Sequence, residues 1–94
     1  MGGRMRIEFV FDDGGTFETG EDDWIGAIAY HDLPANRVWT ESCSDKKALI
    51  KALSAGMKLY LNRGVREYNI DSRVVIEARV IEDGKETVLW RKAE

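Results

Sequence analysis

The segment between Ser44 and Gly64 constrains the fold more than any other part of the chain, because its apolar residues recur at helical spacing. Ser44 is a favourable N-cap, Asp45 complements the helix dipole, and Gly64 stands where a left-handed residue ends many helices. We therefore predict one long helix over this segment. Its apolar stripe comprises Leu49, Ile50, Leu53, Met57, Tyr60 and Leu61.

The residues before this helix predict an antiparallel β-meander. Apolar and polar residues alternate over Arg6–Asp12, which is typical of a half-buried strand. Asp13-Gly14-Gly15 predicts a turn, and Thr16–Thr19 returns as a short second strand. Arg37–Ser42 predicts a further strand. The segment Trp24–Tyr30 fits either a helix or a strand, and its aromatic residues favour the strand.

The residues after the helix predict a β-hairpin. Arg73–Ile81 and Glu86–Lys92 flank Glu82-Asp83-Gly84, which we interpret as a three-residue loop. That loop length places Ala78 opposite Val88 and Ile76 opposite Trp90, and Val65–Ser72 becomes an irregular connector. The prediction is a single α+β domain over 1–94: a β-meander, one long helix packed on one sheet face, and a C-terminal hairpin. We expect residues 1–4 to be disordered.

The strand Arg73–Ile81 suggests association with another molecule. Val74, Ile76, Ala78 and Val80 alternate onto one face, while Val75 and Ile81 fall on the other. A single helix covers only one face of such a sheet. The second face therefore predicts a homodimer or a partner protein, unless strong sheet curvature shields it.

Composition excludes several classes of function. Lys and Arg total 14 against 17 Asp and Glu, so the net charge of −3 disfavours general adhesion to nucleic acid or anionic lipid. The only cysteine, Cys43, forms no internal disulfide and no cysteine-based zinc site. No apolar run approaches the roughly 20 residues that span a bilayer. We expect a cytoplasmic protein without a cofactor or a dedicated metal site.

Acidic residues dominate the first third of the chain. Between Ile7 and Asp32 there are eight Asp and Glu and no Lys or Arg. Solvated turns explain such a stretch, and so does a surface that meets a basic partner. Trp24 and Trp39 fit either core filling or aromatic anchors of an interface. The candidate partner-binding set is Asp12, Asp13, Glu18, Glu21, Asp22, Asp23, Trp24 and Trp39.

The sequence gives weaker support to two alternative kinds of site. Lys47, Lys51 and Lys58 would share one face of the predicted helix and contact phosphates, although the base-reading pattern of a specific reader is absent. Cys43 precedes the helix, where a thiol can become a nucleophile. The only histidine, His31, falls at the other end of the predicted hairpin, so a Cys–His pair is not favoured.

These observations predict a non-catalytic protein-binding module. One form of this hypothesis is a small acidic inhibitor that occludes a basic surface on its target. Phage-type antagonists, such as anti-CRISPR proteins, include many domains of this kind, although no motif assigns this chain to them. The alternative is an accessory protein that binds nucleic acid through the lysine face.

Overall fold

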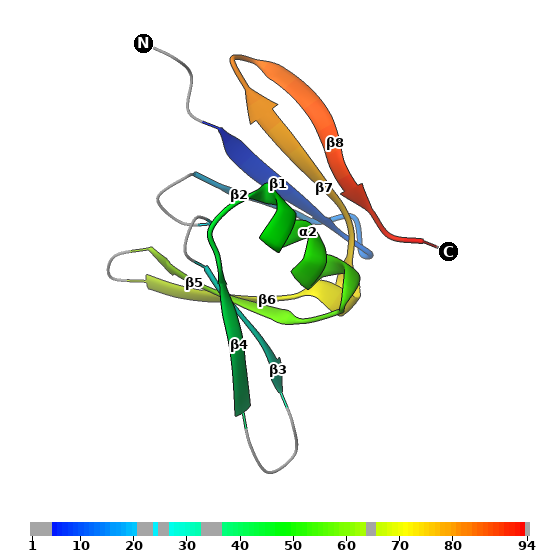
Figure 1. Ribbon diagram of the computed structural model, residues 1–94. Coiled ribbons are helices and arrows are strands. Elements are labelled where there is room, and N and C mark those ends of the chain that lie inside the picture. Colours follow the sequence, from blue (N-terminus) through cyan, green and yellow to red (C-terminus); the bar gives the residue numbers. More distant parts are fainter. Residues whose placement is uncertain (1–4, 21–23, 25–26, 33–36, 64–65, 94) are drawn as a thin grey trace.

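Two four-stranded antiparallel sheets enclose the core, and a short helix lies beside them (Figure 1). The computed structural model describes residues 5–20, 24, 27–32, 37–63 and 66–93. Sheet 1 has the order β2-β1-β7-β8 and consists of β1 (Arg6–Phe11), β2 (Thr16–Thr19), β7 (Val75–Glu82) and β8 (Lys85–Arg91). Sheet 2 has the order β4-β3-β5-β6 and consists of β3 (Ala27–Asp32), β4 (Arg37–Cys43), β5 (Lys58–Arg63) and β6 (Arg66–Asp71).

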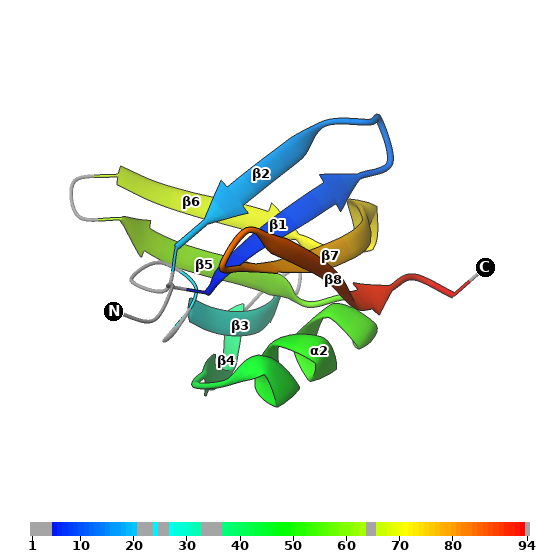
Figure 2. The same cartoon turned by 90° about the horizontal axis from the view of Figure 1, so that it is seen from above.

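The core lies between the two sheets and the helix α2 (Lys46–Ser54). Ile7 and Phe9 are buried because β1 alternates between a core face and an outer face. The helix contacts β4, β8 and the 3₁₀ turn η1 (Ser72–Val74), so it covers the open side between the sheets (Figure 2). The α+β class is confirmed in this coarse form, although the chain is mostly strand.

The prediction of one long helix between Ser44 and Gly64 is wrong for the second half of that segment. The N-cap is Asp45 rather than Ser44, and its carboxylate accepts the Ala48 amide at 2.9 Å. The helix ends at Ser54, and Gly56 adopts a φ of +69°. A left-handed glycine two residues beyond a helix is a common helix stop. The chain then reverses into β5, which carries part of the predicted stripe.

Two further predictions along sheet 2 are corrected. Residues 66–71 of the predicted connector are not irregular, because they form β6, which pairs with β5 along its whole length; residue 65 lies outside the described residues. Within the predicted segment Trp24–Tyr30, Trp24 is helical and residues 27–30 belong to β3, while residues 25 and 26 lie outside the described part of the chain. The register of β3 against β4 shifts between Ala29 and Tyr30, and both residues are buried. The strands at Arg6, Thr16 and Arg37 are confirmed, the last extending to Cys43.

The C-terminal hairpin forms with a different loop and register. Asp83 and Gly84 alone connect the strands, with φ values of 53° and 76°, as a tight hairpin turn requires. A bulge in β8 then sets Trp90 opposite Ala78 and Val88 opposite Arg79. The three-residue loop and the pairs Ala78–Val88 and Ile76–Trp90 are therefore wrong.

The outer face of sheet 1 carries a charged cluster, and Val88, which lies opposite Arg79, is 46 % exposed beside it. A register shift between β1 and β7 turns Val75 inward, so it joins Ala78 and Val80 in the core, while Ile76 is exposed. Arg79 forms ion pairs with Glu77, with Glu86 at 3.4 Å and with Glu8 at 3.8 Å. Val75 therefore leaves the predicted second face, whereas Ile81 stays half-buried, and a homodimer through this face stays a prediction.

Candidate functional site

The β1–β2 turn presents two acidic residues from the candidate partner-binding set. Asp12 and Asp13 are both exposed at its tip. Four hydrogen bonds fix the turn: Phe11 N to Gly15 O at 2.8 Å, Gly14 N to Phe11 O at 3.0 Å, Gly15 N to Asp13 Oδ1 at 2.8 Å and Asp12 N to Val74 O at 2.9 Å. The acidic pair is therefore held on a rigid tip that is anchored to η1.

The other acidic candidates do not gather around this tip. Glu18 lies on the outer face of sheet 1 and forms an ion pair with Arg6 at 3.0 Å. Glu21, Asp22 and Asp23 lie outside the described residues. Of the acidic candidates that the structure describes, only Asp12 and Asp13 lie together.

The structure describes the side chain of Trp24 but not that of Trp39. Trp24 is 1 % exposed, and its indole N–H donates to Met5 O at 3.3 Å, so it fills the core rather than offering an anchor to a partner. Trp39 pairs with Tyr30 along the β3–β4 ladder, and its side chain lies outside the described part of the chain.

The lysine face of the alternative hypothesis is not continuous. Lys47 and Lys51 are exposed on α2. Lys58 lies on β5 opposite Asp71, because the helix ends before it. The three ammonium groups therefore do not share one helix face.

Cys43 and His31 occupy opposite ends of the β3–β4 ladder. Cys43 pairs with Ala27 and is fully buried, while His31 pairs with Val38. The described residues contain no cluster of three or more side chains suited to holding a metal ion.

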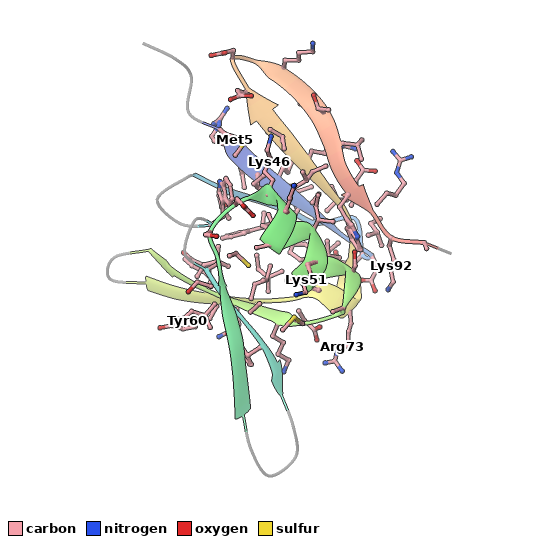
Figure 3. The ribbon with its side chains drawn as sticks, viewed as in Figure 1. Met5, Lys46, Lys51, Tyr60, Arg73 and Lys92 are labelled. Carbon is pink, nitrogen blue, oxygen red and sulfur yellow. The ribbon has the colours of Figure 1, made fainter. Side chains whose placement is uncertain are left out.

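A basic groove that the sequence analysis missed lies at the end of α2. It has a volume of about 480 Å³ and opens between α2, η1 and the end of β8. Trp90 donates its indole N–H to Ser54 Oγ at 3.0 Å, and Lys92 Nζ donates to the Arg73 carbonyl at 2.7 Å. Figure 3 labels Arg73 and Lys92 near the end of α2. Its lining includes Leu53, Ser54, Ser72, Arg73, Trp90, Arg91 and Lys92.

Carboxylates just outside the groove engage its two arginines. Arg73 donates to Asp71 at 2.7 Å and at 3.0 Å, and these hydrogen bonds lower the pKa of the Asp71 carboxyl. Arg91 donates to Glu77 at 3.1 Å. The pKa of the Glu77 carboxyl is lowered chiefly by the hydrogen bond from Arg79, with Arg91 adding to it.

Comparison with protein families, with curated proteins and with solved structures finds no match to this chain. Within its described residues, no helix combines the length and the apolar character needed to cross a membrane.

Proposed function

We propose that the protein is a non-catalytic protein-binding module, and that the β1–β2 tip contacts a basic surface on its partner. One hydrogen bond carries this proposal. The Asp12 amide donates to Val74 O at 2.9 Å, which places the exposed acidic pair beside a valine that is itself 39 % exposed. The β1–β2 tip and Val74 thus present negative charge and apolar surface side by side.

Both parts of this surface favour binding to a protein. Asp12 and Asp13 attract a basic partner and speed its encounter. Val74 supplies apolar area that gains free energy when water leaves it. Because the turn is already fixed by hydrogen bonds, little conformational entropy is lost on binding.

The wider hypothesis is an inhibitor that occludes a basic groove on its target, as phage-type antagonists such as anti-CRISPR proteins do. Glu21, Asp22, Asp23 and Trp39 stay predicted parts of its interface. We also propose a cytoplasmic location, since a sequence with a single cysteine forms no internal disulfide. The predicted homodimer through the outer face of sheet 1 stays a competing proposal.

The test compares two hairpin tips that carry the same charge. The variant Asp12→Asn with Asp13→Asn removes two negative charges and keeps the Oδ1 acceptor for the Gly15 amide. The control variant Glu82→Gln with Asp83→Asn removes two charges at the β7–β8 turn, where asparagine tolerates the positive φ. Both variants have the same net charge.

The measurement is a quantitative pull-down from native lysate, with and without nuclease. We expect one stoichiometric protein that survives nuclease, is lost with the β1–β2 variant and is retained with the control. Equal recovery by both variants contradicts the proposed contact. Recovery that disappears with nuclease, and also with Lys47→Glu and Lys51→Glu, would instead favour nucleic-acid binding.

A further inference from the structure

We infer that the β1–β2 tip recognises an arginine side chain of its protein partner, and that a hollow beside the tip holds the stem of that side chain. The inference rests on the proposed function, because it names what the tip contacts on the partner. This β2–β6 hollow lies where β1 and β2 of sheet 1 come beside β6 of sheet 2. It is lined by Phe11, Thr16, Phe17, Tyr68, Asn69 and Ile70.

Aromatic residues from both sheets line the β2–β6 hollow. The ring centroids of Phe17 and Tyr68 lie 5.1 Å apart, and the ring planes are tilted by 44°. Both residues are half-buried, as is Phe11, so they pack against the core and also border the hollow. The face of an aromatic ring attracts a cation, and a planar guanidinium also stacks on it. The lining therefore suits an arginine side chain.

The β2–β6 hollow has the size of a side chain rather than of a free ligand. Its volume is about 190 Å³, below the roughly 300–1,000 Å³ that is typical of small-molecule pockets. Ile70 is 4 % exposed and adds apolar surface. Asn69 is held in place, because its Oδ1 accepts the Tyr30 hydroxyl at 2.8 Å. A wall fixed in this way loses little conformational entropy when a partner side chain enters.

A carboxylate borders the hollow on the side of the tip. Asp13 Oδ1 accepts the Gly15 amide at 2.8 Å. A Cβ built on Gly15 would lie 3.0 Å from this oxygen and 3.9 Å from Phe11 Cδ2, so the carboxylate and the Phe11 ring flank the same point. Asp12 adds a second exposed negative charge. A carboxylate beside aromatic residues is complementary to arginine, which has a charged guanidinium on an apolar stem.

The neighbouring charges leave this preference for a cation in place. Arg73 precedes Val74, whose carbonyl anchors the tip. Its guanidinium forms an ion pair with Asp71 at 2.7 Å, so this pair adds no net charge beside Asp12 and Asp13. A nucleotide would also stack on the aromatic residues, but the two carboxylates would repel its phosphate. The hollow therefore favours a basic protein segment over nucleic acid.

The test is an NMR titration of the full chain with three short peptides that differ at one position. They are acetyl-Gly-Ala-Arg-Ala-Gly-amide and its lysine and citrulline counterparts, and citrulline has the shape of arginine without the charge. We expect the arginine peptide to shift the amides of Gly15, Phe17 and Tyr68 at millimolar concentration. The lysine peptide should bind severalfold more weakly, because an ammonium neither stacks on a ring nor pairs with both carboxylate oxygens. The citrulline peptide should bind about tenfold more weakly, because its hydrogen bonds to the carboxylate are not charge-assisted.

Two pairs of variants test the assigned residues. Asp13→Asn keeps the acceptor for the Gly15 amide and should weaken binding of the arginine peptide about tenfold, whereas Asp83→Asn removes the same charge at the β7–β8 turn and should bind like the wild type. Thr16→Lys places a positive charge in the hollow and should abolish the shifts. Thr87→Lys adds the same charge on β8 and should leave them unchanged. Both threonines are exposed, so the two lysine variants should have similar melting temperatures.

Several results would overturn the inference. One is the absence of any shift with the arginine peptide in the millimolar range. Another is equal binding of the arginine peptide and of either counterpart, which would remove the guanidinium as the recognised group. Equal weakening by Asp13→Asn and Asp83→Asn would indicate a general charge effect. Binding of the arginine peptide to Thr16→Lys with wild-type affinity would place the contact outside the hollow.

Failure of this inference differs from failure of the proposed function. If the partner is lost with the Asp12→Asn and Asp13→Asn variant while the arginine and citrulline peptides bind equally, the tip contacts the partner but does not recognise arginine. If the peptides behave as expected while the pull-down recovers the partner equally with both hairpin variants, the hollow prefers arginine but the tip is not the contact with that partner.

Discussion

Replacing Gly56 by alanine distinguishes the observed helix end from the predicted long helix, because the two conformations give opposite signs. An alanine inside a continuing helix would stabilise the protein by about 1 kcal/mol relative to glycine. In the structure Gly56 has a φ of +69°, a conformation that costs an L-residue roughly 1–2 kcal/mol. The same substitution should therefore destabilise the folded state.

The expected loss follows from two opposing contributions. Alanine restricts the unfolded chain, which returns about 0.4–1 kcal/mol. The new Cβ would lie 3.5 Å from Arg73 Cγ, an ordinary van der Waals contact that adds no steric cost. The net destabilisation is about 1 kcal/mol, which lowers the melting temperature by roughly 4–8 °C in a domain of this size.

Urea denaturation followed by far-UV circular dichroism measures this difference. Gly56→Asn should lose less stability, since asparagine tolerates the left-handed region. Gly20→Ala is the matched control, because no described atom lies within 4 Å of its added Cβ and its φ is not positive. If Gly56→Ala raises the unfolding free energy by about 1 kcal/mol, the helix continues through this position and our account is refuted.

Three further predictions concern the core, the ion pairs and the thiol. Leu59→Ala should lower the unfolding free energy by about 2–5 kcal/mol, because Leu59 is fully buried. Val88→Ala is the control and should change it by less than about 0.5 kcal/mol, because Val88 is 46 % exposed. Similar losses in the two variants would contradict the assigned burial. Hydrogen bonds hold the pKa of Glu77 below its ordinary value of 4.5, so the unfolded chain binds the proton first and this carboxylate's contribution to stability disappears as pH falls below 4.5. The urea midpoint of Glu77→Gln should accordingly decline less on acidification than that of the wild type, and parallel declines would count against the ion pairs. Cys43 should react with a thiol reagent only as fast as the protein unfolds, and immediate labelling of native protein would show that it is accessible.

The hairpin from Arg6 to Thr19 could be predicted from the sequence because one pattern explains it. Apolar residues alternate along β1, and Gly14 and Gly15 mark the turn. No other secondary structure fits that spacing, and the strands that the local pattern predicts are the ones present in the folded protein.

The error after Ser54 arose because two patterns overlap. Met57 and Leu61 continue the helical spacing, while Leu59 and Leu61 also alternate as a buried strand face requires. Gly56 was the available signal, since a glycine costs free energy inside a helix but none at its end.

The basic groove could not have been found by spacing. Ser72 and Lys92 become neighbours only after the β7–β8 hairpin returns the chain to η1. The bulge in β8 shifts the register at Leu89, and a bulge is not encoded by the alternation of apolar residues. The sequence shows the basic residues but does not show that they meet.

The pairing of β1 with β7 has a consequence for how the protein folds. Ile7 lies opposite Val80, so sheet 1 joins segments from the two ends of the described chain, and all of sheet 2 falls between them. Closing such a long loop costs entropy before any contact forms, which slows folding. During synthesis, β1 and β2 leave the ribosome before β7, so β1 has no pairing partner other than β2 until β7 emerges. Over that interval the unpaired edge of β1 is the segment that most needs protection from aggregation.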